Sequence, residues 1–274
     1  MVFIINFLNT LLPILYFTCT YLYGAYFFRN DDFAEKYMSR ILQFTVAIHF
    51  LDVILRWYHF DHFPLASIFE ALTVIGLAAI LVYLYLEFRI KVKTTGFFIL
   101  VFIFILQLIS SAFIDFTESL PEILKNRLFV FHTSAAILGY SGFAISFLYS
   151  LMYLLLFHNI KKSRFGVIYS RLPSLEVLSS LNYYSATFGF FFLTAAIVLG
   201  GIWANKIWGQ FLSTDPKIVV AYLTWFIYGL EIFSGRFLNW SSKKLAYLSM
   251  SGFAIILFSM VAVNLFLTSF HEFQ

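Results

Sequence analysis

Residues 183–204 read YYSATFGFFFLTAAIVLGGIWA, and residues 205–217 continue as NKIWGQFLSTDPK. The first stretch has no charged residue and is long enough to cross a bilayer, because a helix needs about 20 apolar residues to span the hydrocarbon core. The second stretch is short, polar and charged at both ends. Together they predict a membrane-spanning helix that ends in a tryptophan-bearing connection, which we place at residues 200–217.

The rest of the chain has the same character. Of its 274 residues, 61% are apolar and only 12% are charged, about half the charged fraction of a soluble domain. Most of its surface must therefore face lipid. Eight segments are long enough to span: 3–28, 40–58, 65–87, 95–114, 128–157, 183–204, 217–235 and 245–268. We predict an all-α fold, a polytopic transmembrane bundle of about eight helices in a single integral-membrane domain, 1–274.

Two further features narrow the class. No basic residues precede the first apolar run, so it is predicted to be a spanning helix and not a cleaved signal peptide. The single cysteine, Cys19, lies inside that helix, which argues against disulfide chemistry and thiol-based catalysis.

The basic residues predict an orientation. Connections 1–2, 3–4, 5–6 and 7–8 hold 13 of the 18 Lys and Arg, and the other side holds Arg56, Lys125, Arg127, Lys206 and Lys217. A basic excess marks the cytoplasmic side. Both termini and the 200–217 connection are therefore expected on the extracytoplasmic face.

Two histidines are predicted to reach the same face. His132 lies about one turn inside the outer end of the fifth segment, and His271 follows the last segment. Trp203 and Trp208 come from the 200–217 connection. Imidazole is an axial ligand for haem iron, and indole rings can stack on a porphyrin. The alternative is that both histidines are ordinary interfacial or tail residues.

Four elements of the sequence resemble the cytochrome c assembly family of haem-handling membrane proteins, which includes CcsA-, CcmC- and HemX-like members. They are the Pro…Glu element in 63–70, the "H-x-S…Y" element in 131–140, the tryptophan-rich "WWD" loop in 201–217, and the "V-N-L…H" element in 263–271. They follow the family's order, and the resemblance covers 45–274.

The resemblance implies a haem site on the outer face. His132 and His271 would be the axial ligands of the iron of haem b, either bound or transferred as substrate. Trp203, Trp208, Asp215, Lys206, Lys217 and Glu70 would be the other cofactor-binding residues. No residue is assigned a catalytic role, and the chain is expected to be at most part of a haem-attachment system.

The sequence also departs from the family pattern. Leu212 and Thr214 stand where the full loop has two more tryptophans, and Ile218 stands where a Glu follows the Asp-Pro-Lys. Phe233 occupies the position of the inner transmembrane histidine of the synthases. The chain therefore resembles a divergent, HemX-like member more than a complete synthase.

The implied function is to present or transfer haem at the extracytoplasmic face in cytochrome c biogenesis. The expected partners are a cytochrome c assembly protein, an apocytochrome c, haem and the lipid bilayer, with no nucleic acid. The expected location is a bacterial inner (cytoplasmic) membrane. The alternatives are a HemX-like regulator of haem synthesis and a haem-free polytopic transporter.

The intramembrane pair Asp52 and Arg56 is expected to form a structural polar cluster. Asp52 and Arg56 are four residues apart on one helix face, so they can pair with each other. His49, one turn before Asp52, is a substitute candidate for an inner ligand, while Glu70 and Glu231 need partners that the sequence does not identify.

The two tryptophans set a geometric condition. On a continuous helix, positions five residues apart lie about 140° from each other. For Trp203 and Trp208 to line one pocket, the chain must leave regular helix between them, with Gly200, Gly201 and Gly209 easing the departure. The alternative is that both rings only anchor the helix end in the headgroups.

Overall fold

The computed structural model describes residues 1–65, 67–116, 126–209 and 216–266, with the backbone alone described at 208, 217 and 260–266. These residues form nine helices and no strand, which confirms the all-α prediction. In order they are α1 Val2–Arg29, α2 Asp32–Phe60, α3 Ile68–Ile90, α4 Gly96–Phe113, α5 Arg127–Lys161, α6 Val167–Arg171, α7 Leu175–Trp208, α8 Pro216–Phe237 and α9 Ser242–Phe266.

The helices have the lengths that a membrane demands. Within the described residues, α1 to α5, α7 and α8 are each long and apolar enough to cross a membrane. The last long helix, α9, has 25 residues, although the side chains over its final quarter are outside the description. A polytopic helical bundle is thus confirmed, and the short α6 is the one helix among these nine that is too short to span.

Helix ends follow capping residues, not the limits of the apolar runs. The Asp31 side chain accepts a hydrogen bond from the Ala34 N–H and starts α2, eight residues before the predicted segment at 40. The Ser174 side chain likewise accepts from the Val177 N–H, so α7 begins at Leu175 and not at 183. Such caps satisfy donors that a helix start leaves free. Apolar runs alone therefore placed both starts too late.

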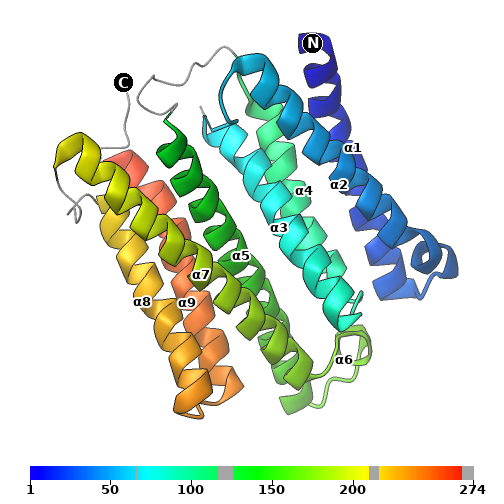
Figure 1. The fold of residues 1–274 in the computed structure, drawn as a ribbon. Coiled ribbons are helices and arrows are strands. Elements are labelled where there is room, and N and C mark those ends of the chain that lie inside the picture. Colours follow the sequence, from blue (N-terminus) through cyan, green and yellow to red (C-terminus); the bar gives the residue numbers. More distant parts are fainter. Residues whose placement is uncertain (66, 117–125, 210–215, 267–274) are drawn as a thin grey trace. The chain divides into compact units, whose positions relative to one another are not determined.

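The chain divides into two compact units, Met1–Leu120 with Asn159–Pro173, and Pro121–His158 with Ser174–Gln274. In the first unit, α1 packs against α2 and α4, and α4 packs against α3 (Figure 1). In the second unit, α8 packs against both α7 and α9.

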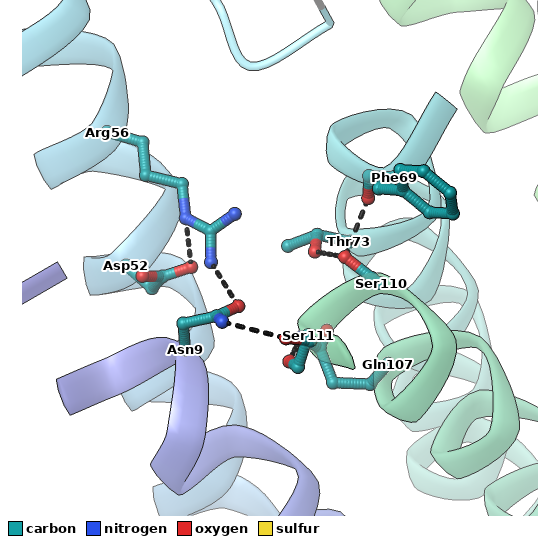
Figure 2. Close-up of polar contacts among 8 residues, drawn as sticks. All are labelled: Asn9, Asp52, Arg56, Phe69, Thr73, Gln107, Ser110 and Ser111. Atoms are coloured by element: carbon teal, nitrogen blue, oxygen red, sulfur yellow. Dashed lines mark hydrogen bonds and ion pairs between the residues drawn. The ribbon is translucent and has the colours of Figure 1, made fainter. Parts of the chain in front are cut away.

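The first unit has a buried polar core (Figure 2). The Arg56 Nε lies 2.8 Å from Asp52 Oδ2, and both side chains are fully buried, which confirms the predicted pairing. Arg56 Nη2 also donates to Asn9 Oδ1 at 3.2 Å, and Asn9 Nδ2 donates to the Ser111 carbonyl at 3.1 Å. A charge buried in a bilayer needs such partners. The pair therefore ties α1, α2 and α4 together.

His49 belongs to the same core. Its ring is fully buried, and Nδ1 lies 2.8 Å from the Tyr16 hydroxyl on α1. The two rings meet edge to face, with centroids 5.6 Å apart. These contacts give His49 a packing role between α1 and α2.

Candidate functional site

Among the described histidines of the second unit, His132 is the one best placed to act as a ligand. It lies on α5, five residues after the helix begins, and is partly exposed. Its Nδ1 lies 2.8 Å from the Ala196 carbonyl oxygen on α7. A carbonyl oxygen can only accept a hydrogen bond, so Nδ1 carries the proton and Nε2 keeps a lone pair. A hydrogen bond of this kind, from the ring nitrogen that does not face the metal, orients metal-binding histidines in proteins.

Gly200 lies directly against the same imidazole. A Cβ atom placed on Gly200 would come within 2.7 Å of both Nδ1 and Cε1 of His132. The glycine therefore gives the ring room to lie on α7. This corrects the sequence interpretation, in which Gly200 served to break the helix, because α7 continues without interruption past this position.

An aromatic pair forms the next layer. The Phe129 and Trp203 rings have centroids 5.3 Å apart at an interplanar angle of 50°, and the Phe129 ring is 6.4 Å from the His132 ring. Trp203 is 3% exposed, so its indole is part of the packing and not a free anchor. Sequence reasoning missed Phe129, although its position three residues before His132 puts it on the same helix face.

The expected departure from helix between the two tryptophans is wrong. The helix α7 runs through Trp208 and ends at Gly209, which takes a left-handed conformation with φ 70°. Positions 203 and 208 therefore lie about 140° apart around one helix. Trp203 packs against Phe129 in the His132 cluster, and position 208 lies on a different side of the same helix.

The other predicted residues have mixed outcomes. Lys206 is exposed in the last turn of α7, one turn beyond Trp203. Glu70 belongs to the first unit, where it is buried and its backbone N–H donates to Ser67 Oγ at 3.2 Å. Lys217 is described by its backbone alone, in the first turn of α8. Asp215 and His271 lie outside the described residues.

A second polar cluster lies deeper in the same unit. Asn182 Nδ2 on α7 donates to Glu231 Oε1 on α8 at 3.1 Å. The Ser146 hydroxyl on α5 donates to Asn182 Oδ1 and lies 2.7 Å from Ser249 Oγ on α9. All four side chains are buried, so each of the four long helices contributes one polar group. The sequence analysis indicated that Glu231 needs a partner, and the structure identifies this partner as Asn182.

Phe233 on α8 is exposed, unlike the four buried residues of the polar cluster. It stands at the position where the resemblance puts an inner histidine, and it is 51% exposed on the outside of α8. Glu231, two residues earlier, is 2% exposed and points inward. The predicted absence of an inner histidine therefore corresponds to an exposed aromatic position on α8.

The chemistry of the His132 cluster suits an iron that brings most of its own ligands. Within the described residues, no group of three or more His, Cys, Asp or Glu side chains could hold a bare metal ion. Haem iron is already bound by four porphyrin nitrogens and needs only one or two axial ligands, often imidazoles. One oriented imidazole beside an aromatic pair fits that need.

The long apolar helices and the oriented imidazole define a class, the multi-pass membrane proteins with a candidate metal-ligating histidine near one end of the bundle. The family model of the cytochrome c assembly proteins matches residues 65–271. This chain therefore belongs to that family and is a membrane protein of cytochrome c biogenesis.

Curated relatives agree. The cytochrome c biogenesis protein CcsA of Guillardia theta is 28% identical over 98% of this chain and 96% of its own length. CcsA of Cyanophora paradoxa is 26% identical over 97% of this chain and 96% of its own. CcsA of Prochlorococcus marinus is 27% identical over 81% of this chain and 79% of its own. The identity levels fit a divergent member.

Proposed function

We propose that this protein binds haem b at the extracytoplasmic face and presents or transfers it during cytochrome c biogenesis. The observation that carries the proposal is the His132 imidazole, whose Nδ1 is engaged by the Ala196 carbonyl at 2.8 Å. That contact leaves the Nε2 lone pair for iron. Family membership supports haem as the group that is handled.

The proposal assigns His271 as the second axial ligand. It is the last histidine of the chain and lies at the end of the region that the family model matches. Two imidazoles would give a six-coordinate, low-spin iron. Lys206, Lys217 and Asp215 would act on the haem propionates or on the loop that surrounds them, since Lys and Arg pair with carboxylates.

The proposal makes the protein one component of a larger system in a bacterial cytoplasmic membrane. The exposed Phe233 replaces the inner histidine that the resemblance assigns to complete synthases. We therefore expect a cytochrome c assembly partner to supply the missing steps and an apocytochrome c to receive the haem. The same residue favours, as a second candidate, a HemX-like regulatory role in which haem is held and not attached.

The test is an absorption spectrum of the detergent-purified protein, oxidised and reduced. We expect the sharp visible bands of a low-spin, bis-imidazole haem. His132→Ala and His271→Ala should each change the spin state and weaken haem retention, and the double variant should lose haem. The control is His59→Ala, because His59 is exposed in the first unit and should leave the spectrum unchanged. A double variant with the wild-type spectrum would refute the ligand assignment.

A further inference from the structure

We infer that Gly200 is a positioning residue, which fixes the direction in which His132 presents Nε2 to a ligand. The inference rests on the proposed haem-binding function and adds to it a residue that makes no contact of its own with iron. It follows from three contacts between α5 and α7.

The first contact sets the rotation of the ring. The hydrogen bond from Nδ1 to the Ala196 carbonyl is 2.8 Å long. Ala196 and Gly200 are four residues apart, so they occupy the same face of α7 in successive turns. One turn therefore offers an acceptor and the next offers a position without a side chain, both to the same imidazole.

The second contact sets how close the ring comes to α7. A Cβ on Gly200 would stand 2.7 Å from Nδ1 and Cε1 and 3.5 Å from Cγ of His132. Carbon atoms pack best at roughly 3.5–4.0 Å, so an alanine at this position would displace the ring by about 1 Å. A displacement of that size would stretch the Nδ1 hydrogen bond beyond the roughly 3.2 Å limit for an N–H···O bond. A side chain at 200 and the hydrogen bond to Ala196 are therefore incompatible without separating the helices.

The third contact limits how far the helices can separate. Eleven residues earlier on α7, Gly189 lies against Gly139 and Phe143 of α5, where an added Cβ would be 2.8 Å from the Gly139 carbonyl oxygen and 2.5 Å from the Phe143 ring. The two backbones are thus in close contact at this second point. Relief of the clash at Gly200 must therefore come mainly from the imidazole.

The experiment compares Gly200→Ala with Gly189→Ala in the full-length haem-loaded protein. Both substitutions crowd α5 against α7, but only the first touches His132. We expect Gly200→Ala to convert part of the haem to a high-spin form and to weaken retention by about 10- to 100-fold, the usual effect of losing a partner that orients a metal ligand. Gly189→Ala should lower thermal stability and keep the wild-type spectrum.

Two outcomes would overturn the inference while leaving the proposed function intact. One is a wild-type spectrum and retention in Gly200→Ala when His132→Ala has lost both. The other is an equal spectral change in Gly189→Ala, which would make the effect one of general helix packing. If His132→Ala itself keeps the wild-type spectrum, the proposed function fails first.

A measurement on the wild-type protein without haem covers the case in which Gly200→Ala does not fold. Nitrogen-15 NMR of histidine-labelled protein, with His132 assigned by comparison with His132→Ala, reports which ring nitrogen carries the proton. We expect a protonated Nδ1 and an unprotonated Nε2. The opposite tautomer would overturn the inference, because the ring would not be held on the Ala196 carbonyl.

Discussion

The buried Asn182–Glu231 pair allows a double-mutant cycle in which the double variant is expected to be more stable than the single variant Asn182→Leu. Asn182→Leu removes the donor to Glu231 Oε1, and Glu231 Oε2 has no hydrogen-bond partner among the described residues. Glu231 is 2% exposed, so water cannot replace the lost donor. Ser146 loses one acceptor and keeps its contact with Ser249, 2.7 Å away.

The magnitude follows from these contacts. A buried polar group left without a partner costs about 1–3 kcal/mol, and the Ser146 hydrogen bond is worth about 1 kcal/mol. Asn182→Leu should thus lower the unfolding free energy by about 2–4 kcal/mol. Glu231→Leu should cost about 1–3 kcal/mol, because it leaves the Asn182 amide without its acceptor. The double variant replaces both partners by apolar side chains, which can be nearly neutral, so that mainly the Ser146 hydrogen bond stays lost. It should therefore be more stable than Asn182→Leu alone.

The assay is reversible unfolding of the purified protein in mixed micelles, followed by tryptophan fluorescence and circular dichroism for the wild type, both single variants and the double variant. A favourable coupling of at least about 2 kcal/mol is expected between the two positions. Strictly additive losses, with the double variant the least stable of the four, would refute the view that each residue serves mainly to satisfy the other.

Three further predictions follow from other parts of the chain. Arg171→Ala should lower the unfolding free energy by about 2 kcal/mol, a value reduced for partial exposure, because Arg171 donates to the Tyr26 and Phe27 carbonyls and to the Asn30 side chain at the end of α1. The control is Arg164→Ala, since Arg164 is exposed, and equal melting temperatures of the two variants would contradict the reasoning. A reporter that is active only in the cytoplasm should work when inserted between α5 and α6 and stay silent when fused after the last residue, and the reverse pattern would put the His132 cluster on the wrong face. Trp203→Ala should reduce haem occupancy partially and leave the spectral type of the retained haem unchanged, since aromatic pairing adds about 0.5–1.5 kcal/mol beyond area burial; undiminished occupancy would limit Trp203 to a packing role.

The sequence was sufficient for the fold class and for the partners of some charges, but not for the details of the site. Apolar length predicts where a helix must cross lipid, and the four-residue spacing of Asp52 and Arg56 predicts their pairing. The starts of α2 and α7 were missed because capping by Asp31 and Ser174 extends a helix beyond the hydrocarbon.

The contacts between helices could not be predicted in this way. That Ala196 and Gly200 receive His132, and that Asn182 meets Glu231, depends on the rotation of one helix against another. A segment that is apolar on all sides carries no periodic signal for that rotation. Gly200 was recognised from the sequence, but it was interpreted as a source of flexibility, whereas the structure shows that it makes space for the His132 imidazole.

Because α5 and α7 are longer than the bilayer is thick, the surroundings of the His132 cluster can depend on bilayer thickness. They contain 35 and 34 residues, or about 51–53 Å at 1.5 Å per residue, against a hydrocarbon core of ~30 Å. Helices this long must tilt or extend into the headgroups. His132 lies five residues from the start of α5, or about 7.5 Å along the helix axis. If the excess length is shared between the two helix ends, this position is close to the boundary between hydrocarbon and headgroups. Under the proposed function, the choice of lipid would then change the polarity around the His132 imidazole where it binds haem.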